Sequence, residues 1–173
     1  ALASTMLADP GCSGGIPVCK SNLADVFSTP SDPMVTSYVW TVPAGAIIVS
    51  GQGTPSIVVD WSGTPPGVGQ VCVKTQNVCG ESANLCETVF IRQVAAGAAI
   101  NAPACTGGNI NLFGTGGVSY QWSGPNGFSS SNASPVIFGA TPANSGTYTV
   151  TVTDSEGCTA SATVATTVYP NPS

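Results

Sequence analysis

Short stretches of alternating polar and apolar residues run along the whole chain, and none keeps the 3.6-residue apolar spacing of an amphipathic helix. In the clearest stretch, 147–153, Tyr148, Val150 and Val152 fall on one face and threonines on the other. Turns rich in Gly and Pro separate these stretches. They predict an all-β fold with strands near 37–42, 46–50, 56–61, 70–76, 84–94, 109–113, 118–122, 135–138 and 159–169.

One set of landmarks occurs twice. Tyr38-Val39-Trp40 and Tyr120-Gln121-Trp122 each follow one cysteine and precede another that lies in a turn, as expected of a repeated module. Small residues near 93–97 mark the boundary between the copies. We therefore predict two tandem β-sandwiches over 15–94 and 95–168. A segment over 1–14 precedes them, and a linker or the start of another domain follows at 169–173.

The chain is 42% hydrophobic but only 6% charged, far below the quarter or so of charged residues that is usual in soluble domains. Its basic residues are Lys20, Lys74 and Arg92, against eight carboxylates. Such a chain cannot neutralise a run of phosphates, which excludes nucleic acid as a partner. Anionic lipid headgroups are excluded for the same reason, and no apolar run approaches the roughly 20 residues needed for membrane insertion.

Seven cysteines could indicate either a metal site or disulfides. The chain has no His and no Cys-x-x-Cys knuckle, so disulfides are the better interpretation and no zinc site is expected. Disulfides predict a secreted or cell-surface, extracellular location. For a metal, only a calcium site built from Asp25, Asp32 and loop carbonyls stays open, because no EF-hand pattern is present; otherwise no cofactor is expected.

The ionisable residues do not suggest an enzyme. The most common general acid–base group is missing, since the chain has no His. Asp154 and Glu156 share a hairpin turn, where Asp ordinarily bonds local backbone N–H groups. All eight carboxylates are scattered over loops and turns, and we predict no catalytic residue among them: Asp9, Asp25, Asp32, Asp60, Glu81, Glu87, Asp154 and Glu156.

Aromatic residues leave one alternative function, a carbohydrate-binding accessory module of a secreted protein. Trp61 and Phe128 are the candidate sugar contacts, because an exposed ring can stack on a sugar. Trp61 alternates in phase with Ile57 and Val59, however, which favours a place in the core. Phe128 follows a turn and is also suited to cover the end of a sandwich.

Two features resemble the immunoglobulin sandwich. Trp40 and Trp122 stand where that fold has its buried strand-C tryptophan, and Ser145-Gly146-Thr147-Tyr148 resembles its tyrosine corner. The resemblance implies that Trp40, Trp122 and Tyr148 are core residues. The sequence departs from antibody domains at Val150, which occupies the position of the usual inter-sheet cysteine.

More specific segments resemble modules of large cell-surface proteins of Bacteroidota. Residues 38–46, 51–54, 60–61 and 77–80 are similar to their PKD-like modules, and residues 122–128, 146–154 and 157–158 to their Ig-like repeats. Residues 168–173, Val-Tyr-Pro-Asn-Pro-Ser, resemble the start of a sorting domain read by the type IX secretion system, although Pro-Asn-Pro is also an ordinary linker. The resemblance implies a non-enzymatic adhesin module or surface fibre.

Aligning the two copies implies the disulfides Cys19–Cys79 and Cys105–Cys158, the latter closing one end of the second sandwich. Cys72 and Cys86 are out of phase with their apolar neighbours on adjacent strands, so we expect a cross-strand bond between them on the outer face. This leaves Cys12, for which three states stay open: free, bonded to Cys86 instead, or bonded to another chain.

The expected partners are neighbouring domains or identical subunits joined head to tail, with surface glycans as a further candidate. Residues 1–11 carry Ala3, Met6 and Leu7 before a Pro-Gly break, so we expect this segment to pack on a neighbour. A head-to-tail contact that does not close on itself gives a fibre. The alternative is a plain adhesin stalk.

Overall fold

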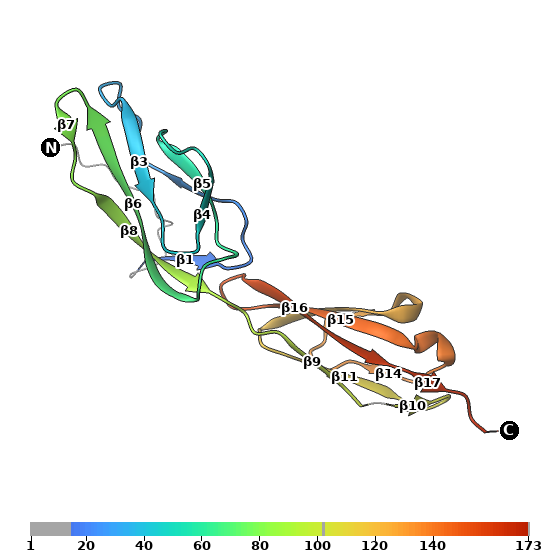
Figure 1. Ribbon diagram of the computed structural model, residues 1–173. Coiled ribbons are helices and arrows are strands. Elements are labelled where there is room, and N and C mark those ends of the chain that lie inside the picture. Colours follow the sequence, from blue (N-terminus) through green and yellow to red (C-terminus); the bar gives the residue numbers. More distant parts are fainter. Residues whose placement is uncertain (1–14, 102, 173) are drawn as a thin grey trace. The chain divides into compact units, whose positions relative to one another are not determined.

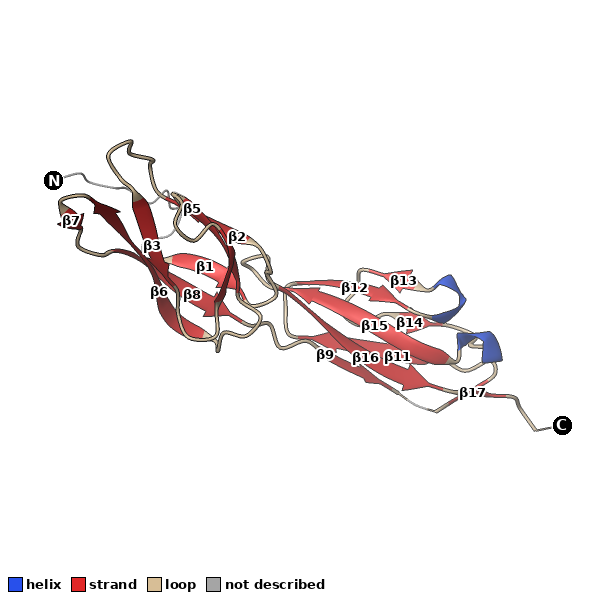
Figure 2. Cartoon of the chain, turned by 45° about the horizontal axis from the view of Figure 1, so that its top comes forward, coloured by secondary structure: helices blue, strands red, loops and turns tan. Residues whose placement is uncertain are grey.

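The computed structural model describes residues 15–101 and 103–172. The chain divides into two compact units, with the boundary along the sequence between Gln93 and Val94. Strands and turns make up both units (Figures 1 and 2). The helical residues in the described part of the chain are confined to two three-residue turns, η1 (Pro125–Gly127) and η2 (Pro142–Asn144). The prediction of an all-β fold is therefore confirmed.

The first unit consists of two sheets. In the larger of them, β1 (Ile16–Cys19) runs parallel to β8 (Leu85–Arg92), so that Ile16 lies opposite Val89 and Cys19 opposite Arg92. The larger sheet has the order β1 (Ile16–Cys19), β8 (Leu85–Arg92), β6 (Gly67–Asn77), β3 (Ser37–Thr41), with β7 (Gly80–Glu81) also paired to β6. The smaller has the order β2 (Asp25–Ser28), β5 (Ser56–Asp60), β4 (Ile47–Ser50).

Inward-facing residues of both sheets form the core of this unit, as their alternation requires. Trp40, Trp61, Ile57, Val59, Val71 and Val89 are among its buried members. Hydrogen bonds fix Trp40: its Nε1 donates to the Thr54 carbonyl at 2.8 Å, and the side-chain amide of Gln52 bonds the Trp40 backbone N–H and C=O at 3.2 and 3.1 Å. The predicted core role of Trp40 agrees with this burial.

The second unit has a four-stranded sheet, a three-stranded sheet and a short parallel pair. The first has the order β13 (Ser129–Ser130), β12 (Ser119–Ser123), β15 (Gly146–Thr153), β16 (Thr159–Thr166). The second has the order β14 (Val136–Ile137), β11 (Ile110–Thr115), β9 (Gly97–Ile100). The parallel pair is β10 (Ala104–Cys105) with β17 (Val168–Tyr169).

Trp122, Tyr148, Val150 and Val152 are fully buried in the second unit, as predicted. The Tyr148 hydroxyl donates to the backbone carbonyl of Asn144 at 2.8 Å. A tyrosine corner has this bond from the phenol to a backbone group a few residues upstream. The bond therefore ties the turn η2 to β15.

Several strands differ from those predicted. The region expected as one strand over 159–169 is two, β16 and β17, separated by Thr167. The short strands β1, β2 and β9 were not predicted. Each has four residues, too few to show a clear period, and β9 (Gly-Ala-Ala-Ile) consists mainly of small residues.

Candidate functional site

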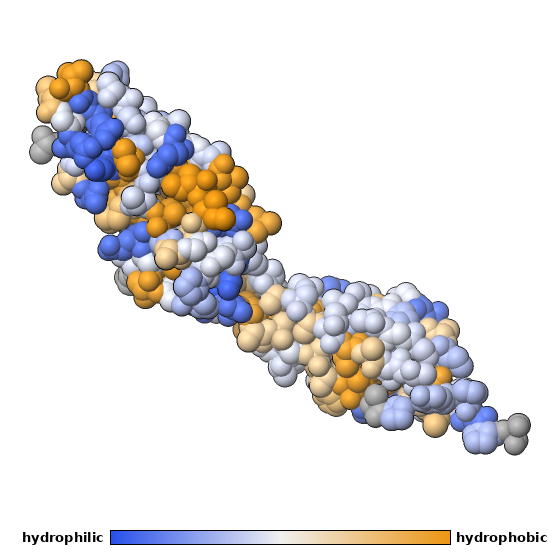
Figure 3. Space-filling model, viewed as in Figure 1, coloured by the Kyte–Doolittle hydropathy of each residue, from blue (hydrophilic) through white to orange (hydrophobic). Residues whose placement is uncertain are grey.

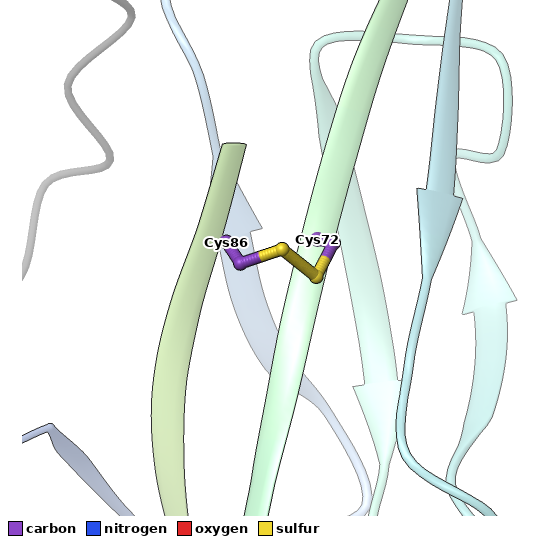
Figure 4. The surroundings of a disulfide bond; sticks show 2 residues. All are labelled: Cys72 and Cys86. Atoms are coloured by element: carbon purple, nitrogen blue, oxygen red, sulfur yellow. A yellow bond between two sulfur atoms is a disulfide. The ribbon is translucent and has the colours of Figure 1, made fainter. Parts of the chain in front are cut away.

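A disulfide joins the two long strands of the first unit (Figure 4). The register of β6 and β8 places Cys72 opposite Cys86, with their Cα atoms 4.0 Å apart. Val71 and Val73, on either side of Cys72, are buried, so the sulfur atoms lie on the outer face of the sheet. The predicted cross-strand bond between these cysteines is confirmed.

The expected bond between Cys19 and Cys79 is wrong. Cys79 is a free, exposed thiol, whereas Cys19 is disulfide-bonded. Cys19 lies opposite Arg92 at the last residue of β8, and Cys79 lies in the turn between β6 and β7, beyond Leu85 at the first residue of β8. The length of β8, about 23 Å at 3.3 Å per residue, separates the two ends of the unit.

The expected bond between Cys105 and Cys158 fails for the same reason. Cys105 is free and exposed, and Cys158 is disulfide-bonded. Cys158 directly precedes β16, whereas Cys105 lies opposite Tyr169, which follows the far end of β16. The segment before β11 and the β15–β16 turn therefore lie at opposite ends of the unit. Cys12, the segment 1–14 and the packing expected of residues 1–11 fall outside the described residues.

A groove opens beside Cys79 at the end of the first unit. Its volume is about 880 Å³, and Pro30, Pro33, Val35 and Leu85 line it together with Cys79. Tyr38 and Val73 also contribute to its lining although both are buried, so they form its floor. The groove therefore presents apolar surface next to an exposed thiol.

Two of the charged groups at this end form an ion pair. The Lys74 ammonium contacts the Glu81 carboxylate, which also accepts a hydrogen bond from the Gln76 amide. These two donors, the lysine first, lower the pKa of Glu81 below its usual value. Asp32 is used locally, since its carboxylate accepts the Met34 backbone N–H at 2.8 Å.

Apolar side chains gather on a different face of the first unit, over β4 and β5 (Figure 3). The exposed members on this three-stranded sheet are Val26, Ile47 and Val49, between 58% and 67% exposed. Val26 lies opposite Val58 across the β2–β5 pair, so the patch continues between strands. The sequence alone does not reveal this patch, because single exposed valines are common on protein surfaces.

Neither candidate sugar contact is a freely exposed ring. Trp61 is completely buried and packs edge-on against Phe27, with ring centroids 5.9 Å apart, so it cannot stack on a sugar. Its phase with Ile57 and Val59 had favoured this core position. Phe128 is half-buried, with its ring 5.6 Å from that of Tyr148, and covers one end of the second unit.

The expectation that all the carboxylates lie in loops and turns is wrong for four of them, because Asp25, Asp60, Glu81 and Glu87 lie on β2, β5, β7 and β8. Asp25 accepts a hydrogen bond from the Asn22 amide at 2.9 Å. Asp154 accepts the backbone N–H groups of Glu156 and Cys158, each at 2.9 Å, as expected for an aspartate in a turn. Across residues 15–101 and 103–172, no three Cys, Asp or Glu side chains gather in a way that could hold a metal ion.

One family model matches part of the chain. A family model described as a PKD-like domain matches residues 8–89. No curated protein sequence is significantly similar to the chain. In the described part of the chain, no helix has the length and apolar character needed to cross a membrane.

Several solved structures match the chain at low sequence identity and low TM-score. An amphioxus IgVJ-C2 molecule is 13% identical, over 87% of this chain and 98% of its own, with a TM-score of 0.38. The fibronectin(III)-like modules of Clostridium thermocellum CbhA are 13% identical, over 96% and 94%, also with a TM-score of 0.38. The N-terminal four Ig domains of Dscam1 isoform 4.44 are 14% identical, over 97% and 47%, with a TM-score of 0.33. The described part of the chain is all-β apart from two three-residue turns, and residues 8–89 are similar to a PKD-like domain.

Proposed function

We propose that the chain is a non-enzymatic pair of tandem Ig-like β-sandwiches, a structural or adhesive part of a bacterial cell-surface adhesin or surface fibre. The observation that carries the proposal is that each unit has its own core, built on a fully buried Trp and closed by short loops. Such modules serve as spacers or binding surfaces, whose function lies in their outer faces and ends.

Two further observations support an extracellular location. Cys72–Cys86 is a disulfide on the outer face of a sheet, where a cytosolic reductant would reach it. Asp154 and Glu156 are the only Asp, Glu, Lys or Arg residues of the second unit. The residues that it exposes are mainly small or uncharged polar ones, such as Ser, Thr, Asn and Ala. The similarity of residues 168–172 to a sorting sequence favours export by the type IX pathway of Bacteroidota.

Labelling of intact cells tests this function. Antibodies against the purified protein are applied to intact and to lysed cells of the source organism, with an antibody against a cytosolic protein as the control. We expect equal labelling of both samples, and loss of the signal after protease treatment of intact cells. Labelling confined to lysed cells would overturn the proposed function.

Carbohydrate binding is the less supported function, because Trp61 is buried and Phe128 packs on Tyr148. A glycan array probed with the purified protein tests it. We expect the parent protein and Phe128→Ala to give the same signals on the array, so that no glycan depends on the Phe128 ring for binding. A glycan that depends on this ring would replace the structural role with a binding one.

A further inference from the structure

We infer that Cys79 of one copy and Cys105 of the next form a disulfide that joins copies of this chain head to tail. The inference extends the proposed function, on which it rests, to a covalent surface fibre. Its basis is the position of the two exposed thiols. Each thiol lies in its own unit, at the end that is far from the connecting residues Gln93 and Val94.

In the first unit, the chain leaves for the second unit after Arg92, the last residue of β8. Cys79 lies at the other end, in the tight turn between β6 and β7. Its backbone N–H is held by the Asn77 side chain at 2.9 Å, while Val78 beside it is 96% exposed. The thiol therefore stands on a fixed turn at the outer end of the unit, beside the apolar groove.

In the second unit, the chain enters near β9, whose first residue, Gly97, lies opposite Thr115 at the last residue of β11. Cys105 precedes β11, and so lies at the opposite end. It is held there by the parallel pairing of β10 with β17, which places Tyr169 opposite Cys105. The Tyr169 ring is 53% exposed, so this end presents a thiol and an aromatic side chain together.

The two ends complement each other. The groove beside Cys79 offers an apolar lining to an incoming ring, and the end that carries Cys105 supplies one in Tyr169. Burying this end of the second unit desolvates no charged side chain, because Asp154 and Glu156 lie in the β15–β16 turn at the other end. At the groove, Glu81 is already paired with Lys74, and the Asp32 carboxylate, which also lines it, already accepts the Met34 backbone N–H. A second copy of this chain therefore fits as the occupant.

The bond forms by thiol–disulfide exchange with a small-molecule disulfide as the oxidant. One thiolate attacks that disulfide and releases one small thiol; the second thiolate then attacks the mixed disulfide and releases another. Two protein thiols and one small disulfide thus give one protein disulfide and two small thiols. Since the two thiols lie on different surfaces, the contact is heterologous and leaves a thiol at each end of every oligomer, so the oligomer can grow further.

Isotope mixing tests the bond. Equal amounts of ¹⁴N- and ¹⁵N-labelled protein are oxidised together with glutathione disulfide, separated on a non-reducing gel and digested for mass spectrometry. We expect a ladder of oligomers and a Cys79–Cys105 peptide pair in which mixed heavy–light pairs are as abundant as the two matched pairs together. Matched pairs alone would show a bond within one chain, and a Cys79–Cys12 pair or two unreacted thiols would equally overturn the inference.

Two variants separate this bond from random oxidation. We expect Cys79→Ser and Cys105→Ser each to stay monomeric alone, and their mixture to give dimers and nothing longer. Tyr169→Ala should slow dimer formation in that mixture roughly three- to tenfold, the range of an aromatic contact, whereas Phe113→Ala, an exposed ring on β11, should not. Dimers of either single variant at the rate of the mixture would contradict the inference.

These results are distinguishable from a failure of the proposed function. A protein that stays monomeric under oxidation but labels intact cells overturns the bond alone. A protein that is found only inside cells overturns the function, whatever its thiols do in vitro.

Discussion

At the scale of single residues, Trp40 and Trp122 have the same place in the repeated sequence pattern but different surroundings. Trp40 donates its indole N–H to the Thr54 carbonyl, whereas the indole N–H of Trp122 is buried without a hydrogen-bond partner among the described residues. A buried donor without a partner costs roughly 1 to 3 kcal/mol, while a made hydrogen bond contributes about 1 kcal/mol.

This difference predicts unequal costs for one substitution. Trp40→Phe and Trp122→Phe leave similar gaps, but only Trp40→Phe also loses a hydrogen bond. Trp122→Phe also removes an unpaired donor, so we expect Trp40→Phe to lower the free energy of unfolding of its unit by about 2 to 4 kcal/mol more than Trp122→Phe lowers that of the other. Urea unfolding followed separately for each unit measures both. Equal costs would show that the Trp122 indole N–H has a partner.

Tyr148 makes the second unit sensitive to alkali. Burial raises the pKa of its phenol above the ordinary value, and the ionised phenolate could no longer donate to the Asn144 carbonyl. The stability that the neutral phenol provides is present below the unfolded-state pKa of about 10. It is lost as the pH rises from there through the higher folded-state pKa.

We therefore expect Tyr148→Phe to lower the free energy of unfolding of the second unit by about 1 kcal/mol at neutral pH. Above about pH 10, this free energy should fall less steeply with pH in the variant than in the parent. Tyr120→Phe, which loses a phenol bonded to the Gly117 carbonyl at 2.9 Å, is the matched control. Equal alkaline slopes in the parent and Tyr148→Phe would contradict the assignment to this phenol.

At the scale of elements, alternation predicted the long strands and failed for short ones. The run from Tyr148 to Val152 has a clear period because one face is buried and the other carries threonines. In β2, by contrast, Phe27 is the only buried residue of four, so no period can be read from the sequence. Periodicity identifies a strand only when the strand is long enough to repeat.

The disulfides show a second limit of sequence patterns. The alternation of buried and outward-facing positions along β6 and β8 was enough to predict Cys72–Cys86, because it places both cysteines on the outer face of adjacent strands. Aligning the two copies was not enough for Cys79 and Cys105, because similar sequence positions do not show at which end of a unit each turn lies. The groove beside Cys79 was missed as well, since its lining joins residues 30–38 to residues 73–85 across the fold.

The Cys72–Cys86 bond gives a prediction for the hairpin that it closes. Its residues are 14 apart in sequence, for which chain-entropy estimates give about 3 kcal/mol. We expect the double variant Cys72→Ser/Cys86→Ser to lower the unfolding free energy of the first unit by about 2 to 3 kcal/mol. Cys79→Ser, at an exposed free thiol, should change it by less than about 0.5 kcal/mol. A double variant as stable as the parent would contradict a stabilising role.

At the scale of the whole molecule, the account depends on two units that are each stable by themselves. The tryptophans of the first unit pack within its own sheets, and Trp122 packs within the second. Charge is also divided, because all three basic residues, Lys20, Lys74 and Arg92, precede residue 94. Domains that each have their own core can in principle fold alone, and the proposed role as a structural module depends on this independence.

Hydrogen exchange of Trp40→Ala and Trp122→Ala tests this central claim most directly. Each variant removes a fully buried ring, at a cost of about 3 to 5 kcal/mol, which is a large part of the stability of a small domain. We predict that Trp40→Ala exposes the amides of β3, β5, β6 and β8 while those of β11, β12, β15 and β16 stay protected, and that Trp122→Ala gives the reverse. Loss of protection in both units from either single substitution would contradict the account.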